Sequence, residues 1–243
     1  MQHIDVSPNL RVLNGRCAMV LPSRTLVLGD MHLGIEASLE MEGVQLPRVQ
    51  AAEMMRRFTA AAEAHHPRRV VVLGDMKHEF SRNLEQEWSQ VRRMLEHMSS
   101  FAEVTVVRGN HDNYLANITS RAGVDLVDEL EVDGFHLSHG HIPCSGRPLV
   151  QGHEHPSARL FDGVGGFIKM PAFLHHPNER ILVIPAFSPL AAGNDVASIE
   201  GKGALSPGLK DVEMGQAEVY ACSDIGLMAL GKVAGLRGRR GQI

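Results

Sequence analysis

Three short apolar segments, each followed by polar residues and separated by helix-like stretches, constrain the fold of this 243-residue chain most strongly. The apolar segments are residues 25–28, 69–73 and 104–107. Pro47 opens the first intervening stretch, and residues 84–98 of the second repeat apolar side chains at steps of four and three, which is typical of an amphipathic helix. The order strand, helix, strand, helix, strand predicts a parallel sheet with right-handed crossovers.

Polar segments stand where these strands are expected to end, and two more follow later in the chain. The five segments are Asp30-Met31-His32, Gly74-Asp75, Gly109-Asn110-His111-Asp112, His139-Gly140-His141 and Gly152-His153-Glu154-His155. Ligands of parallel sheets gather beyond the carboxyl ends of the strands. Because residues i and i+2 of an extended segment point the same way, Asp30 and His32 are expected to converge.

These segments contain the ligands of a two-metal centre. Asp75 has two oxygens and can bridge two ions, Asn110 offers an amide oxygen, and His139, His153 and His155 offer imidazoles. Nitrogen and oxygen ligands without thiolate suit manganese, with iron, zinc, cobalt or nickel as alternatives. The three cysteines are widely spaced and form no Cys-x-x-Cys pair, which argues against a thiolate zinc site or a disulfide framework.

Such a centre predicts hydrolysis of a phosphoester. Two ions held ~3.5–4 Å apart lower the pKa of a bridging water, and the resulting hydroxide attacks phosphorus. His111 is the catalytic candidate for protonating the leaving oxygen, with a structural histidine as the alternative. For Asp112 two roles stay open, namely holding the His111 ring in one tautomer and stabilising a turn.

The second half of the chain has weaker periodicity. Short apolar runs at residues 166–170, 180–185, 217–221 and 226–230, and a hairpin around Asp133-Gly134, predict a second, mainly antiparallel sheet packed on the first. Residues 201–215 are expected to form a loop or short hairpin. Because no repeat or linker is present, residues 1–243 are expected to form a single domain.

The net charge and the hydropathy of the chain limit its possible partners and its cellular location. The net charge of -4 gives no global attraction to nucleic acid, although a local basic groove stays open. Arg108 and Lys169 are each either a contact to substrate phosphate or a solvated residue. No apolar stretch has membrane-spanning length and no signal peptide is visible, so we expect a cytoplasmic location without membrane contact.

The motifs together resemble the calcineurin-like metallophosphoesterase superfamily. Within it, Gly29-Asp30-Met31-His32-Leu33-Gly34-Ile35-Glu36, Gly74-Asp75-Met76-Lys77-His78-Glu79-Phe80 and Ile184-Pro185-Ala186-Phe187-Ser188-Pro189-Leu190 are similar to ICC-like phosphoesterases, which include relatives linked to DNA ligase. Many relatives carry Asp or Asn shortly after Gly-Asp, whereas Lys77-His78-Glu79 stands here.

The resemblance implies an α/β fold, a four-layer αββα sandwich of two mixed β-sheets flanked by helices. It implies a first metal held by Asp30, His32, Asp75 and His155, and a second held by Asp75, Asn110, His139 and His153. It favours a phosphodiesterase or nuclease acting on a nucleotide or nucleic acid, with a functional link to DNA repair proteins. A phosphomonoesterase and a non-catalytic binding scaffold are the alternatives, and the oligomeric state is left open.

Overall fold

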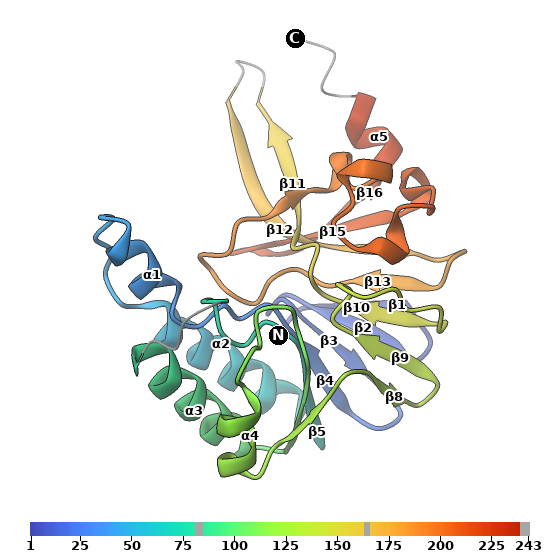
Figure 1. Ribbon diagram of the computed structural model, residues 1–243. Coiled ribbons are helices and arrows are strands. Elements are labelled where there is room, and N and C mark those ends of the chain that lie inside the picture. Colours follow the sequence, from blue (N-terminus) through green and yellow to red (C-terminus); the bar gives the residue numbers. More distant parts are fainter. Residues whose placement is uncertain (81–84, 163–165, 239–243) are drawn as a thin grey trace.

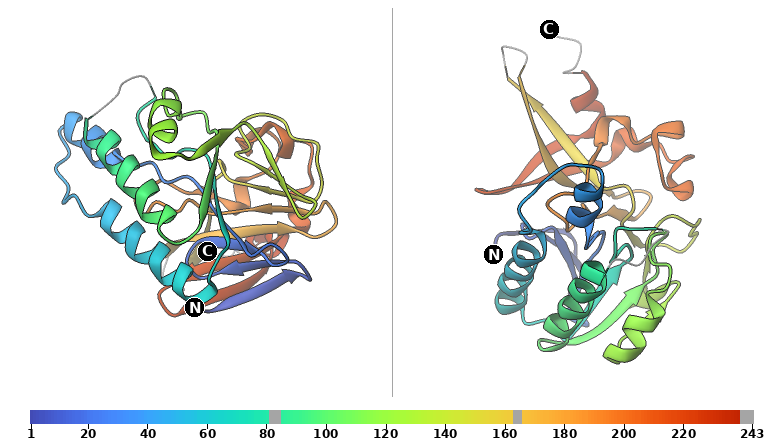
Figure 2. Two further views of the ribbon diagram at one scale, coloured as in Figure 1. Left: turned by 90° about the horizontal axis from the view of Figure 1, so that it is seen from below. Right: turned by 60° about the vertical axis from the view of Figure 1, so that its left-hand side comes forward.

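Two β-sheets pack face to face, with helices on the outer face of the first sheet and short helical turns on the outer face of the second (Figures 1 and 2). The computed structural model describes residues 1–80, 85–162 and 166–238. None of the helices in these ranges is long and apolar enough to cross a membrane. The predicted architecture of two mixed sheets flanked by helices is confirmed.

Within the described residues, the first sheet has seven strands in sequence order. They are β1 (His3–Ser7), β2 (Leu10–Leu13), β3 (Cys17–Val20), β4 (Thr25–Leu28), β5 (Arg69–Leu73), β6 (Glu103–Val107) and β7 (Asp125–Val127). The pairs from β1 to β4 are antiparallel, and those from β4 to β7 are parallel. The predicted parallel arrangement of the three apolar segments is therefore confirmed.

Alternating side chains of these strands build two separate cores. Leu26 and Leu28 pack with Phe58 and Met94 from the helices, whereas Val27 and Val71 face the second sheet. The helices are α1 (Ile35–Met41), α2 (Gln50–His65), α3 (Glu85–Ser99), α4 (Ala116–Ala122) and α5 (Val233–Gly238). The helix predicted over 84–98 is confirmed as α3, except that residue 84 lies outside the described residues.

The second sheet is mixed but mainly antiparallel, as predicted, since five of the strand pairs among the described residues are antiparallel and three are parallel. Its strands are β8 (Leu130–Val132), β9 (Phe135–Ser138), β10 (Leu149–Gln151), β11 (Pro156–Phe161), β12 (Phe167–His176), β13 (Ile181–Val183), β14 (Asn194–Asp195), β15 (Glu218–Ser223) and β16 (Gly226–Lys232). β10 runs parallel to both β9 and β13, because long connections, not tight turns, join these strands in sequence. The parallel pair β9–β10 ends at one edge, where His139 and His153 follow.

The fourth layer consists mostly of short 3-10 turns. These are η1 (Val196–Ser198), η2 (Gly201–Gly203), η3 (Pro207–Leu209) and η4 (Met214–Gln216). Together with α5 they cover the outer face of the second sheet through Ile199, Leu209, Met214 and Val233. Of the two alternatives predicted for residues 201–215, the hairpin is wrong; the segment is a loop with short 3-10 turns, and buried apolar side chains hold it against the sheet.

Candidate metal centre

Seven predicted ligands meet where strands of the two sheets end. They follow β4 (Asp30 and His32), β5 (Asp75), β6 (Asn110), β9 (His139) and β10 (His153 and His155). Each of these strands has at least one parallel neighbour, so their carboxyl ends lie at a common edge. Residues separated by up to 125 positions in the sequence are thereby brought together.

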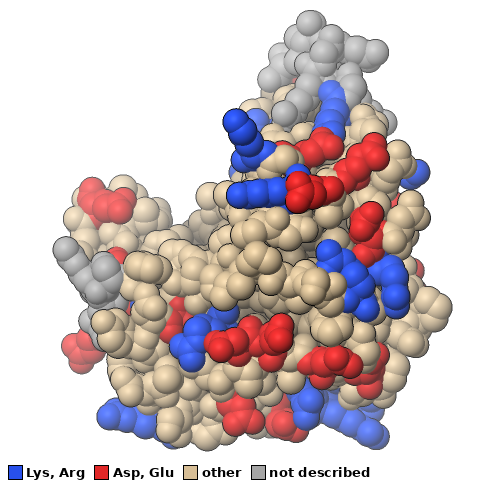
Figure 3. Space-filling view, turned by 45° about the vertical axis from the view of Figure 1, so that its right-hand side comes forward, with Lys and Arg blue, Asp and Glu red and all other residues tan. Residues whose placement is uncertain are grey.

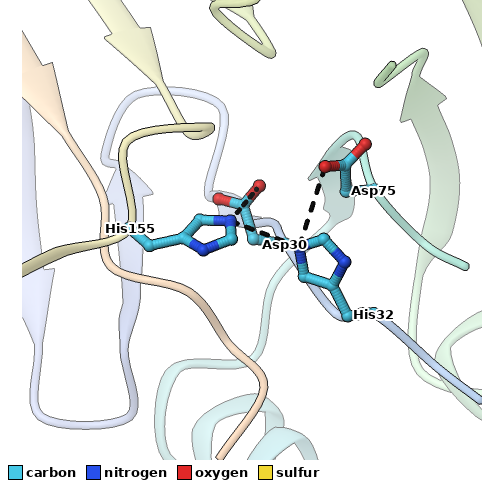
Figure 4. Close-up of side chains that lie close together, drawn as sticks. All are labelled: Asp30, His32, Asp75 and His155. Carbon is cyan, nitrogen blue, oxygen red and sulfur yellow. Dashed lines mark hydrogen bonds and ion pairs between the residues drawn. The ribbon is translucent and has the colours of Figure 1, made fainter. Parts of the chain in front are cut away.

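The first cluster contains Asp30, His32, Asp75 and His155, whose ligand atoms all lie within 4.8 Å of one another. Figure 4 shows these side chains pointing toward one another from three segments of the chain. His155 Nε2 lies 3.2 Å from Asp30 Oδ1 and 3.3 Å from His32 Nε2. His32 Nε2 lies 3.7 Å from Asp75 Oδ2. Both carboxylates are buried, which favours compensation by a cation.

The second cluster contains Asp75, His139 and His153. His139 Nε2 lies 3.5 Å from Asp75 Oδ2, 3.2 Å from His153 Nδ1 and 3.1 Å from Asn110 Oδ1. The Asp75 oxygen that faces His32 in the first cluster therefore also faces His139 in the second. A carboxylate in this position can bridge two ions.

The hydrogen bonds of the ring nitrogens fit metal ligation. His139 Nδ1 donates to the Leu73 carbonyl over 2.8 Å, which leaves a lone pair on Nε2 facing the Asp75 carboxylate. His155 Nδ1 donates to the Ala192 carbonyl over 3.2 Å, so its Nε2 faces Asp30 in the same way. Electron pairs directed at one another need a cation between them, which is either a proton or a metal ion.

The pKa values of the cluster histidines are shifted in different directions. Burial, together with the neighbouring His155, lowers the pKa of His32 to about 2, and burial with His139 lowers that of His153 to about 4. Burial also acts to lower the pKa of His155, but the Asp30 carboxylate outweighs it and raises the value to about 9. At neutral pH the metal-free centre therefore holds a proton on His155, while His32 and His153 are neutral.

Metal binding should consequently release a proton from His155. Because a metal binds only the neutral imidazole, the apparent affinity for Mn²⁺ should rise about tenfold per pH unit between pH 7 and 9 and level off above. Titration calorimetry in buffers of different ionisation enthalpy measures both the affinity and the proton release. An affinity that does not change over this range, with no proton released, would contradict the assignment of His155.

The ligands are presented by backbone in the left-handed region, not by the extended backbone that the sequence analysis assumed. Positive φ angles occur at Asp30 (54°), His32 (45°), Asp75 (49°), His153 (68°) and His155 (45°). Non-glycine residues seldom adopt this conformation, and such strain concentrates at functional sites. The convergence of Asp30 and His32 therefore depends on a turn that strand periodicity does not reveal.

Glycines of the polar segments allow the close approach of these turns. A Cβ at Gly109 would overlap the Asp75 carboxylate and backbone nitrogen, and a Cβ at Gly74 would lie 2.7 Å from Gly109 Cα. The two segments are thus packed backbone to backbone directly beneath the shared carboxylate. Gly-Asp carries little information alone, but here its glycine is required by the fold of the site.

Gly109→Ala should therefore displace Asp75 and weaken metal binding. We expect a loss of roughly 1–3 kcal/mol of folding stability and a lower Mn²⁺ affinity, because the added methyl group cannot be accommodated without backbone movement. Thermal unfolding with and without Mn²⁺ measures both effects. Gly235→Ala is the matched control, because no atom lies within 4 Å of its added Cβ. Equal behaviour of the two variants would contradict this account of Gly109.

His111 lies beside the two clusters without belonging to either. Its Nε2 lies 4.0 Å from Asp75 Oδ2, and its backbone nitrogen donates to Asp75 Oδ1 over 2.9 Å. Its Nδ1 lies 2.6 Å from the His78 carbonyl oxygen, which can only accept, so Nδ1 carries a proton. The other ring nitrogen is then left for chemistry at the centre, and its role as general acid stays a prediction.

Asp112 does not contact the His111 ring as one alternative predicted. Its carboxylate accepts hydrogen bonds from the backbone nitrogens of Met76 (2.9 Å) and Gly109 (2.8 Å). Burial, together with the neighbouring Asp75, raises the pKa of Asp112 to about 6. The His78 carbonyl occupies the position on the ring that Asp112 was expected to take, and the geometry favours the turn role.

Glu87 and Gln50, two buried residues that support the site, were missed in the sequence, whereas half-buried His78 was expected to be either a contact to substrate phosphate or a solvated residue. Glu87 on α3 accepts hydrogen bonds from the backbone nitrogens of His78 (2.9 Å) and Glu79 (2.7 Å). Gln50 on α2 donates to the carbonyl of His32 over 3.0 Å, and His78 Nδ1 lies 3.4 Å from His32 Nδ1. Glu87 and Gln50 each occupy an otherwise apolar helix face. A polar residue at such a position was the feature of the sequence that could have indicated their role.

Several known proteins resemble this chain. The model of the calcineurin-like phosphoesterase family matches residues 23–201. The structure of Pseudomonas putida nuclease MPE resembles this one with a TM-score of 0.69 and 19% sequence identity, covering 94% of this chain and 99% of that one. YfcE, a phosphoesterase from E. coli, gives a TM-score of 0.40 and 15% identity, over 87% of this chain and 94% of YfcE. No curated protein matches the chain. At these identities the structural likeness to nuclease MPE shows a shared fold alone.

Proposed function

The chain belongs to the calcineurin-like phosphoesterase family, and we propose that it is a two-metal phosphodiesterase acting on a nucleotide or nucleic acid. The observation that carries the proposal is the position of Asp75 Oδ2, which faces His32 in one cluster and His139 in the other. Asp30, His32, Asp75 and His155 would hold one ion, and Asp75, Asn110, His139 and His153 the other. We propose manganese for both.

The protein side chains would supply position and protons. A bound pair of divalent ions stabilises charge on the phosphoryl oxygens and activates water. His111 faces the centre through Nε2, while its Nδ1–H is held by the His78 carbonyl. When both ring nitrogens are protonated, Nε2–H can be given to the leaving oxygen, which converts a poor leaving group into a neutral alcohol.

Two considerations favour a diester over a monoester. Nuclease MPE, which shares the fold across 94% of this chain, is described as a nuclease. The segment 184–190, which motivates the resemblance to ligase-linked proteins, lies directly at the site, because Ser188 N donates to the Asp30 carbonyl over 3.2 Å. All seven proposed ligand positions carry side chains able to bind metal, which disfavours a scaffold that has lost catalysis.

The test compares bis(p-nitrophenyl) phosphate with p-nitrophenyl phosphate in the presence of Mn²⁺. We expect the diester to have the higher kcat/KM. A higher kcat/KM for the monoester would instead identify a phosphomonoesterase. Absence of turnover of either substrate by protein shown to contain two ions would identify a binding scaffold and overturn the proposal.

A further inference from the structure

A small pocket adjoins the first cluster on the side of His155. It has a volume of about 190 Å³, and the residues that matter here are Arg16, His155, Ser157, Lys169 and Ser188. His155 lines the pocket and also belongs to the first cluster, so the pocket borders the proposed centre. We call it the Arg16–Lys169 pocket, after the arginine and the lysine that line it.

Arg16 brings a positive charge to this pocket, although the carboxylates of Glu53 and Asp224 act on it from its other side. It lies in the turn between β2 and β3, and its Nη1 donates to the Ser188 carbonyl over 2.9 Å. Within residues 1–80, 85–162 and 166–238, no carboxylate lies within ion-pair distance of its guanidinium. Burial lowers the pKa of Arg16 to about 10, so the group is still charged at neutral pH. A guanidinium has five N–H donors, and the Ser188 carbonyl uses one.

Lys169 supplies the second cation from β12. Its Nζ donates to the Gly193 carbonyl at the rim of the pocket, and its side chain is exposed. Carbonyl groups orient these two cations without neutralising them, since a carbonyl carries no net charge. An ammonium and a guanidinium that share one pocket are suited to bind a phosphate group.

The charge of the molecule as a whole does not explain phosphate binding at this pocket. The β11–β12 hairpin, which carries Lys169, projects from the body of the molecule (Figures 1 and 2). On the face shown in Figure 3, acidic and basic side chains are interspersed and no broad basic patch is present. The overall charge of -4 likewise provides no general attraction for a polyanion. Binding of phosphate outside the centre therefore needs a specific pocket.

We propose that the Arg16–Lys169 pocket binds the phosphate next to the scissile one, so that the substrate is a nucleic-acid strand with at least two phosphates. This inference rests on the proposed phosphodiesterase function. A substrate with one phosphate, such as a cyclic mononucleotide, would leave the pocket unused. The pocket would thus select strands over mononucleotides, and it would fix which side of the centre the strand occupies.

The kinetic test uses two substrates that differ by one phosphate. These are the p-nitrophenyl ester of thymidine 5′-phosphate and the same ester carrying one further nucleotide through a 3′ phosphodiester. Lys169→Gln should raise KM for the two-phosphate substrate about tenfold and leave the one-phosphate substrate unchanged. Lys232→Gln, which removes an exposed charge from β16, is the matched control and should change neither. Equal effects of Lys169→Gln on both substrates would overturn the subsite.

A binding measurement separates the subsite from the proposed function. Fluorescence anisotropy measures the Kd of a labelled oligonucleotide. In EDTA neither metal ions nor turnover contribute, so the Kd depends on the cationic side chains of the protein. Lys169→Gln and Arg16→Gln should each raise Kd several-fold relative to the control, with a shallower salt dependence. If wild-type protein hydrolyses neither ester but these variants weaken binding, the phosphodiesterase proposal fails and the pocket stands as a phosphate site. Unchanged Kd in both variants overturns the pocket.

Discussion

Asp75→Asn should remove both metal ions and lower kcat by at least about 10³-fold. The Asp75 carboxylate is buried and faces His32 Nε2 at 3.7 Å and His139 Nε2 at 3.5 Å with the same oxygen. Asn keeps one oxygen but loses the negative charge. A neutral amide does not offset the charge of two neighbouring cations, so both ions lose their bridging ligand. The rate estimate follows from the several kcal/mol of charge stabilisation that a metal supplies. Metal content after dialysis and steady-state kinetics measure the two effects.

Asp211→Asn is the control for Asp75→Asn, because it makes the same chemical change at an exposed position. It should keep two ions and normal turnover. Loss of one ion only in Asp75→Asn would show that the carboxylate belongs to a single cluster. In that case the two-metal arrangement would have to be replaced by two independent sites.

His111→Asn should keep both ions and lower turnover by roughly 10²–10⁴-fold for substrates with a poor leaving group. The ring is not part of either cluster, so metal content should not change. The size of the defect should depend on the leaving group, because p-nitrophenolate leaves without protonation whereas a nucleoside alkoxide does not. Comparing a p-nitrophenyl diester with a dinucleotide measures this dependence.

His66→Asn is a suitable control for His111→Asn. His66 is exposed at the end of α2 with a φ of 45°, a conformation that Asn tolerates. It should leave both substrates unaffected. A His111→Asn defect of the same size for good and poor leaving groups would assign His111 a positioning role and remove it as the proton donor.

The parallel strands and their polar ends could be predicted from the sequence, because both depend on local patterns. Residues 25–28, 69–73 and 104–107 are apolar runs of strand length, and the amphipathic pattern of α3 marks the crossover between the last two. Since the carboxyl ends of parallel strands meet, Asp30, Asp75 and Asn110 were expected at one edge. The structure places them there, although their role as ligands stays a prediction.

Other features depend on tertiary contacts that no local pattern encodes. The left-handed turns at Asp30 and His32 pair with the segment of Asp75 through backbone hydrogen bonds, from Asp30 N to the Gly74 carbonyl and from His32 N to the Asp75 carbonyl. The parallel pairing of β9 with β10 depends on where the chain between them crosses. The displacement of Asp112 from the His111 ring depends on backbone donors 35 or 36 residues away in the sequence.

Three predictions from the sequence stay untested. The single-domain assignment, the cytoplasmic location and the link to DNA repair proteins stay predictions. The Arg16–Lys169 pocket bears on the last of these, because a strand-specific phosphate site would indicate nucleic acid as the substrate. A nucleic-acid substrate would give the predicted link to DNA repair proteins a chemical basis.

Anomalous scattering from crystals grown with Mn²⁺ tests the central claim most directly. We expect two peaks ~3.5–4 Å apart, one against Asp30, His32 and His155 and the other against Asn110, His139 and His153, with Asp75 between them. A single peak, or two peaks that do not share Asp75, would contradict it.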